Sequence, residues 1–124
     1  MAPLQLLIAD DHPIYLTGLD TVIEEALPNS QRTKCSSRSE LLSCLVAEQR
    51  SDYDLLILDL HMPGFQGTEA LKWVRQCAPE LPVVVVSSIE EPSVVKACIE
   101  MGAFAFVPKS SAQFDVVQAI RRVL

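Results

Sequence analysis

The sequence has few basic residues, no long apolar run and no close pair of cysteines. Its 10 lysines and arginines face 16 aspartates and glutamates, a net charge of −6. Because phosphate neutralisation requires a basic patch, we expect no direct nucleic-acid contact by this domain. Without an 18-residue apolar run or a signal-peptide pattern, we expect no membrane span and a cytoplasmic protein. Scattered cysteines without a C-x-x-C pair predict reduced, mostly buried thiols rather than disulfides or a metal site: Cys35, Cys44, Cys77 and Cys98.

Short apolar runs alternate with amphipathic stretches along the whole chain. The length of 124 residues predicts one domain. Strict β-α alternation predicts an α/β fold, in which a parallel sheet is covered by helices on both faces through right-handed crossovers. The runs bounded by turn residues predict five strands, over Leu4–Ala9, Gln31–Ser36, Tyr53–Leu58, Pro82–Ser87 and Ala103–Pro108.

The amphipathic stretches predict five helices. Pro13 suits a first helical turn, and Ser39 is the expected N-cap of the second helix. The last stretch reaches Leu124 without a stop signal, so we expect a chain cut from a longer protein. The expected core-facing stripes are Ile14, Leu19, Val22, Ile23 and Leu27; Leu41, Leu42, Leu45 and Val46; Ala70, Leu71 and Val74; Val94, Val95, Cys98 and Ile99; and Val116, Val117, Ile120 and Val123.

Three carboxylates follow two of the predicted strands. Asp10 and Asp11 come after the first strand, and Asp59 comes after the third. Because the carboxyl ends of parallel strands share one edge, where α/β folds bind ligands, these side chains should lie close together. At about 5 Å and an effective dielectric near 20, each ionised pair repels by roughly 3 kcal/mol. An all-oxygen acidic cluster therefore predicts a hard cation, and Mg²⁺ suits it best.

Two further residues are expected at the same edge. Ser87 ends the fourth strand, and Lys109 follows the fifth. An ammonium and a hydroxyl beside carboxylates and a metal would bind a phosphoryl group. Each residue has an ordinary alternative when taken alone: an aspartate can cap a helix or close an Asx-turn, Ser87 can be a turn residue, and Lys109 can be a solvated surface charge. The combination favours a shared site.

Four motifs together resemble the receiver domain of bacterial-type two-component response regulators. They are Ile8–Pro13 (IADDHP), Leu58–Gly64 (LDLHMPG), Ser87 and the Pro108-Lys109 pair. The order and intervals match over the whole chain. Residues 119–124, together with the Asp-Asp-His-Pro opening, resemble receivers that precede a LuxR-type helix-turn-helix domain. The resemblance implies a flavodoxin-like, doubly wound (βα)5 fold with strand order 2-1-3-4-5.

The resemblance also implies a role for each site residue. Asp59 would be the phosphoacceptor, a carboxylate nucleophile that attacks a phosphohistidine or a small donor such as acetyl phosphate. Lys109 would be its counter-charge. The hydroxyl of Ser87 and the ring of Phe106, which lacks the hydroxyl of the common tyrosine, would form the switch. The implied Mg²⁺ ligands are Asp11 and Asp59 directly, the backbone carbonyl of His61, and Asp10 through water.

The implied function is a phosphorylation-driven switch within residues 1–124, a single receiver domain that is not an enzyme beyond its own phosphorylation and dephosphorylation. Its output surface would span about residues 92–124. The implied partners are a histidine kinase or phosphotransfer protein, a C-terminal DNA-binding domain of the same protein, and a second receiver in a phosphorylation-dependent homodimer. Two alternatives remain open: a degenerate or stand-alone receiver that only binds proteins, and an aspartyl-phosphate phosphatase, which adjacent aspartates and the lack of a cap domain disfavour.

Overall fold

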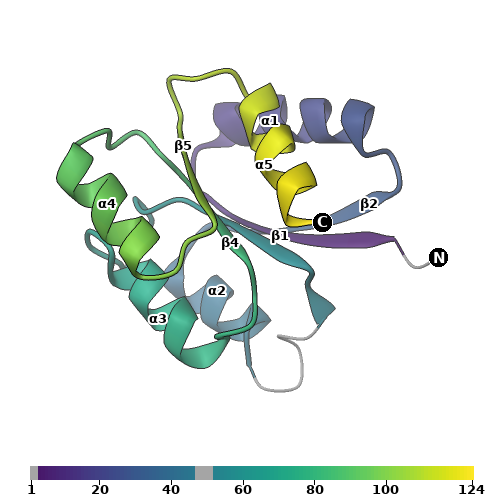
Figure 1. Ribbon diagram of the computed structural model, residues 1–124. Helices are drawn as coiled ribbons and strands as arrows, with labels where there is room; N and C mark the ends of the chain where they lie inside the picture. Colours follow the sequence, from purple (N-terminus) through teal and green to yellow (C-terminus); the bar gives the residue numbers. More distant parts are fainter. Residues whose placement is uncertain (1–2, 47–51) are drawn as a thin grey trace.

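A five-stranded parallel sheet forms the centre of the molecule, with strand order β2-β1-β3-β4-β5 (Figure 1). The computed structural model describes residues 3–46 and 52–124. Strands and helices alternate strictly, as expected from the sequence pattern. The elements are β1 (Leu4–Ala9), α1 (Pro13–Ala26), β2 (Ser30–Cys35), α2 (Arg38–Cys44), β3 (Leu55–Leu58), α3 (Glu69–Cys77), β4 (Val83–Ser87), α4 (Pro92–Glu100), β5 (Ala105–Pro108) and α5 (Phe114–Val123).

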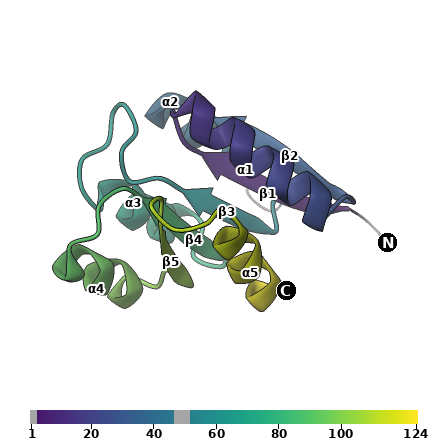
Figure 2. The same ribbon diagram turned by 90° about the horizontal axis from the view of Figure 1, so that it is seen from above.

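The helices cover both faces of the sheet. Helices α1 and α5 lie on one face, and α3 and α4 lie on the other (Figures 1 and 2). Alternate residues of the central strands serve the two sides, so Leu6 and Ile8 pack against α1 and α5 while Leu7 packs with α2, α3 and α4. Strands β3 and β4 are buried on both faces, which explains their continuous apolar sequences.

Strand β1 matches its predicted bounds, and β5 begins two residues later than expected. The cause is the end of α4. Gly102 has φ +101° there, its N–H donates to Ile99, and the N–H of Ala103 donates to Cys98 at 3.0 Å. This is a Schellman motif, which commits Ala103 to closing the helix.

Three apolar residues expected in the core are exposed. Ile14 is 90% exposed, and Val46 and Ile99 are about half exposed. Ile14 lies five residues before the buried Leu19, which places it about 140° away around the helix, whereas Tyr15 lies four residues before Leu19 and faces the core side. Val46 lies beyond the end of α2. The prediction was wrong at these three positions.

Helix α2 begins earlier than the sequence suggested. Its N-cap is Ser37, whose Oγ accepts from the N–H of Glu40 at 3.3 Å, so the assignment to Ser39 was wrong. The Glu40 carboxylate in turn accepts from the N–H of Ser36 at 2.7 Å. Ser37 and Glu40, three residues apart, form a variant of the capping box. This pair of contacts explains why the helix begins after Ser37 and not after Ser39, which lies nearer the apolar stripe.

No disulfide joins the four cysteines, all of which lie among the described residues. Cys35 and Cys98 are buried, and Cys44 and Cys77 are partly exposed. Burial raises the pKa of the Cys35 thiol to about 12, so this thiol stays protonated at neutral pH. Within residues 3–46 and 52–124, no helix is long and apolar enough to cross a membrane.

Candidate functional site

The acidic residues meet at the carboxyl edge of the sheet. Ala9 of β1 pairs with Leu58 of β3, so the next residues, Asp10 and Asp59, leave adjacent strands side by side. Backbone hydrogen bonds continue the ladder, because the N–H of Asp59 donates to Ala9 at 2.8 Å. Asp59 is 1% exposed and Asp10 is 3% exposed. Two carboxylates are therefore held together almost out of contact with solvent.

Each of these aspartates also closes its own turn. Oδ1 of Asp10 accepts from the N–H of His12 at 2.8 Å, and Oδ1 of Asp59 accepts from the N–H of His61 at 3.0 Å. These are Asx-turns, so the local alternative is present together with the shared site. One oxygen of each carboxylate is used locally, and the other faces the middle of the site.

Lys109 provides positive charge between the two buried aspartates. Its Nζ lies 2.9 Å from Oδ2 of Asp10 and 3.1 Å from Oδ2 of Asp59. Its side chain is only 12% exposed, so it is not a solvated surface lysine. Ser87 pairs with Pro108 in the sheet, and the N–H of Lys109 donates to the carbonyl of Ser87 at 2.9 Å. The end of β4 thus fixes where Lys109 leaves β5.

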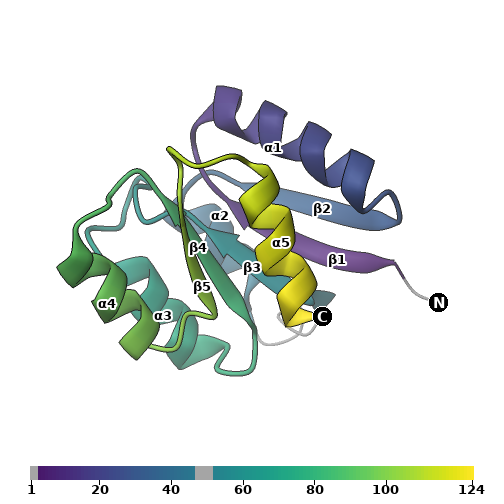
Figure 3. The ribbon, with the colours of Figure 1, turned by 45° about the horizontal axis from the view of Figure 1, so that its top comes forward.

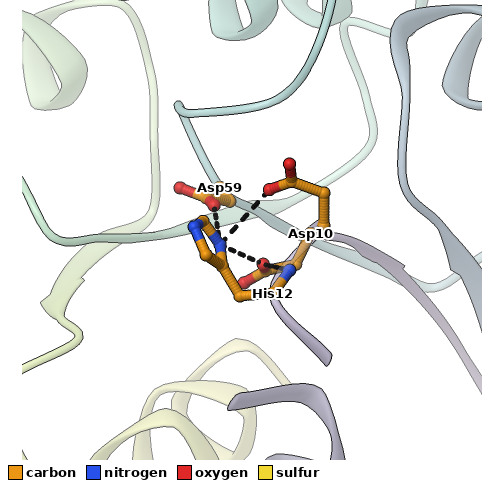
Figure 4. A group of neighbouring side chains, drawn as sticks. Asp10, His12 and Asp59 are labelled. Atoms are coloured by element: carbon orange, nitrogen blue, oxygen red, sulfur yellow. Dashed lines mark hydrogen bonds and ion pairs between the residues drawn. The ribbon is translucent and has the colours of Figure 1, made fainter. Parts of the chain in front are cut away.

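The imidazole of His12 lies between the carboxylates (Figure 4). Its Nδ1 is 2.8 Å from Asp10, 3.1 Å from Asp59 and 3.3 Å from Asp11, and it lies 2.8 Å from Nζ of Lys109. Nδ1 either donates to a carboxylate or accepts from the ammonium, according to its tautomer. The sequence did not assign His12 to the site. Its place directly after Asp11 was the available signal.

The three carboxylates of this cluster fit a hard divalent cation. Asp10, Asp11, His12 and Asp59 each offer one ligand atom within 4.8 Å of the others. Oδ1 of Asp11 is buried and has no hydrogen-bond partner among the described residues, although Nδ1 of His12 lies 3.3 Å away. A buried carboxylate oxygen without a donor is costly, and a cation would satisfy it. Three carboxylates against one ammonium leave the site acidic, which favours Mg²⁺ over softer metals.

The pKa of Asp59 is raised above its usual value. Burial is the largest cause, and the nearby charge of Asp10 adds to it. The N–H of His61 and the ammonium of Lys109 oppose the rise but do not cancel it. A carboxylate that is ionised at neutral pH in this position is therefore destabilised, and it gains from any added positive charge.

The remaining predicted site residues lie around this centre. Ser87 is fully buried, and its Oγ accepts from the N–H of Ile89 at 3.1 Å. Phe106 on β5 is partly buried and packs against the core between the sheet and α2, α3 and α4. His61 has an exposed side chain and enters the site through its backbone. Lys109 thus contacts Asp10 and Asp59, and a carboxylate oxygen of Asp11 lies within 4.8 Å of theirs. Ser87 and Phe106 lie on the neighbouring strands β4 and β5.

A hollow of about 500 Å³ lies away from this cluster, at the opposite edge of the sheet. Its lining includes Tyr53 and Asp54 before β3 and Leu81 and Pro82 before β4. Because it contains none of the clustered carboxylates, we place the chemistry at the carboxyl edge.

Comparison with known proteins assigns the family. The sequence model of the response regulator receiver domain family matches residues 6–121 of this chain. The chain is 38% identical over 120 residues to the glycerol metabolism activator of Pseudomonas putida, covering 97% of this chain and 53% of that protein. It is 29% identical over 122 residues to the response regulator GacA of Pseudomonas aeruginosa, covering 97% of this chain and 55% of that protein.

Solved structures agree with this assignment. The RcsB response regulator of Salmonella typhimurium has a TM-score of 0.87 at 25% identity, covering 99% of this chain and 60% of that chain. A CheY-like receiver of Methanospirillum hungatei, with a TM-score of 0.82 at 20% identity over 97% of this chain and 92% of that one, shows the same fold. The chain spans about half the length of the two curated relatives above. With the family model matching nearly its whole length, the chain belongs to the receiver domains of two-component response regulators.

Proposed function

We propose that this receiver accepts a phosphoryl group on Asp59 and converts it into a changed output surface. The observation that carries the proposal is the position of Asp59, a buried carboxylate that ends β3 with Oδ2 3.1 Å from the ammonium of Lys109 and beside Asp10. A carboxylate nucleophile needs its attacking oxygen free of a local turn, and Oδ1 rather than Oδ2 accepts the turn hydrogen bond.

The proposed chemistry is the transfer of one phosphoryl group from a donor to Asp59. An oxygen of Asp59 attacks the phosphorus of a phosphohistidine or acetyl phosphate, the bond from phosphorus to the donor breaks, and an acyl phosphate forms. The donor leaves as imidazole or acetate. Lys109, within 3.1 Å of Asp59, then neutralises part of the added charge of about −1.5 to −2. The domain catalyses its own phosphorylation and dephosphorylation and no other reaction.

Mg²⁺ is the proposed cofactor. Asp11 and Asp59 would bind it directly, the backbone carbonyl of His61 would supply a further oxygen, and Asp10 would act through water. The support is the carboxylate cluster together with Oδ1 of Asp11, which has no hydrogen-bond partner in the described part of the chain. When bound, the cation neutralises charge on the transferred group and aligns it with the nucleophile. His12 must leave the centre of the cluster for the carboxylates to bind a metal, since its Nδ1 lies among the same oxygens.

The switch would run from Ser87 to Phe106 and then to α4, β5 and α5. The hydroxyl of Ser87, whose oxygen accepts from the N–H of Ile89, would turn to donate a hydrogen bond to the phosphoryl group, and the ring of Phe106 would follow. Phe106 is partly buried and packs against the core, so a change of its rotamer would repack this side of β5. Because the ring has no hydroxyl, this transition is steric.

The proposed partners follow from the relatives. A histidine kinase or phosphotransfer protein supplies the phosphoryl group, and a DNA-binding domain that follows residue 124 receives the signal. The support is that solved RcsB structures include complexes with DNA, one of them with phosphomimetic beryllofluoride, and that the relatives are about twice as long as this chain. A phosphorylation-dependent homodimer through α4, β5 and α5 is the proposed active form in the cytoplasm.

Beryllofluoride binding tests the proposal. We expect Mg²⁺ with beryllofluoride to shift the backbone amide NMR signals of Ser87, Ala103 and Phe106 and to leave an Asp59→Asn variant unchanged. Signals near β2, such as those of Thr33 and Lys34, serve as the internal control. An unchanged wild-type spectrum at Ser87, Ala103 and Phe106 would exclude the proposed switch.

A further inference from the structure

The ammonium of Lys109 contacts an aromatic ring as well as two carboxylates. Its Nζ lies 4.8 Å from the centroid of the Tyr15 ring, on α1. This distance is within the range of a cation–π interaction. Lys109 is therefore held from two sides, by Asp10 and Asp59 at the sheet edge and by Tyr15 in the first turn of α1.

Tyr15 contacts Lys109 through the face of its ring rather than through its hydroxyl. The hydroxyl oxygen is buried and has no hydrogen-bond partner among residues 3–46 and 52–124. Burial raises the pKa of Tyr15 to about 12, with smaller contributions from the charges of Asp10 and Asp59. The side chain is accordingly neutral at physiological pH and presents an uncharged π-face to the lysine.

A second contact ties the same turn of α1 to the loop that carries Lys109. Nε2 of Gln113, at the start of α5, donates to the backbone carbonyl of Tyr15 at 2.8 Å. Gly18 allows this approach, because a Cβ there would lie 2.5 Å from Oε1 of Gln113. Figure 3 shows α1 and α5 on the same side of the sheet, with the loop after β5 reaching towards α1. The backbone of Tyr15 is thus fixed relative to the segment between Lys109 and Gln113.

We propose that the Tyr15 ring positions the Lys109 ammonium against Asp10 and Asp59 and thereby sets the rate at which Asp59 accepts a phosphoryl group. The inference rests on the proposed function of Asp59. Lysine has a flexible four-carbon stem and a point charge, so one aromatic face restricts where the charge can lie. Tyr15 touches no reacting atom and acts only through Lys109.

Two measurements test this role. In the wild-type protein we expect the ε-methylene protons of Lys109 to be shifted upfield by the ring current of Tyr15, a signal that simple packing of α1 would not produce. We expect the phosphorylation rate with acetyl phosphate and Mg²⁺ to fall about fivefold in Tyr15→Leu, which corresponds to roughly 1 kcal/mol of cation–π energy. Tyr15→Phe keeps the ring, so its rate should stay within about twofold of wild type.

Tyr53 provides the matched control, because it is the other of the two tyrosines and lies before β3 at the opposite edge of the sheet. Tyr53→Leu should leave the rate unchanged. An unshifted Lys109 signal in the wild type would overturn the inference even if Tyr15→Leu fails to fold. Equal rates for Tyr15→Leu and wild type, or an equal loss in Tyr53→Leu, would also overturn it. A wild-type protein that takes no phosphoryl group would instead refute the function of Asp59, with the Lys109 signal unaffected.

Discussion

At the scale of single residues, the site is governed by unbalanced negative charge. Asp10 and Asp59 are buried beside each other, and Lys109 is the ammonium that contacts both. Because burial outweighs the favourable contacts at Asp59, its pKa is raised. The fold keeps a charge arrangement that opposes its own stability, which is expected where a site must attract a cation and then a phosphoryl group.

The raised pKa of Asp59 predicts how stability depends on pH. The carboxyl binds a proton more readily in the folded than in the unfolded protein, so its contribution to stability is greatest below about pH 4 and is lost as the pH rises through the folded-state value. Without Mg²⁺, Asp59→Asn should therefore be more stable than wild type at pH 7, by on the order of 1 kcal/mol. Urea unfolding with a chelator measures this difference.

The stability advantage of Asp59→Asn should shrink as the pH is lowered towards 4, because the wild-type carboxyl then gains a proton and becomes neutral, like the asparagine. Asp115→Asn removes the same charge from an exposed aspartate in the first turn of α5, so it is the control and should not stabilise the protein at pH 7. A less stable Asp59→Asn protein at pH 7 would contradict the electrostatic account of the site.

Mg²⁺ should neutralise the excess negative charge of the site. A ligand that binds only the folded state at ten times its Kd adds about 1.4 kcal/mol of stability, which raises the melting temperature by several degrees. Asp11→Asn should remove most of this increase, because Oδ1 of Asp11 is a buried carboxylate oxygen without a hydrogen-bond partner among the described residues. Differential scanning fluorimetry with Mg²⁺ or with a chelator gives the comparison. An equal increase in Asp11→Asn would place the cation elsewhere.

At the scale of elements, the loop after β3 is held in place by α2. The N–H of Arg38 donates to Pro63 at 3.0 Å, its guanidinium lies 5.3 Å from the ring centroid of Phe65, and Gly64 turns with φ +94°. This loop also presents His61 to Asp59. The geometry of the site therefore depends on contacts made by the start of a helix on the other side of the loop.

Gly64→Ala should disturb this loop. An added Cβ would lie 2.6 Å from Cβ of Arg38, and the positive φ is strained for any residue with a side chain. We expect a loss of about 2 kcal/mol or more in urea unfolding, together with weaker Mg²⁺ binding. Gly67→Ala is the control, because its φ of +54° imposes the backbone strain of the left-handed region but nothing lies within 4 Å of its Cβ. Equal losses for both variants would argue against the contact with Arg38.

The N-cap of α2 can be tested in the same way. Ser37→Ala removes the hydrogen bond to the N–H of Glu40 and should cost about 1 kcal/mol of stability. Ser39→Ala lies inside the helix, where alanine is favoured, so its effect should be small or stabilising. Thermal or urea unfolding of the two variants distinguishes the positions. A larger loss in Ser39→Ala would restore the N-cap that the apolar pattern suggested.

At the scale of the whole molecule, the sequence predicted the sheet, the element order and the edge at which the carboxylates meet. Continuous apolar runs ended by aspartates predicted β1 and the end of β3 correctly, because burial on both faces admits few other readings. The contact of Lys109 with Tyr15 could not be predicted, since it joins the loop after β5 to the first turn of α1. The central position of His12 depends in the same way on loops from distant parts of the chain.

The central claim is that Asp59 alone takes the phosphoryl group. Incubation with acetyl phosphate and Mg²⁺, followed by intact-mass measurement and peptide mapping after borohydride reduction, tests it most directly. We predict a mass increase of one phosphoryl group, located at Asp59. The increase should be absent in Asp59→Asn, and it should also be absent from the wild type when a chelator removes Mg²⁺. A phosphoryl group on His12, Asp10 or Asp11, or an unmodified wild-type protein under these conditions, would contradict the account.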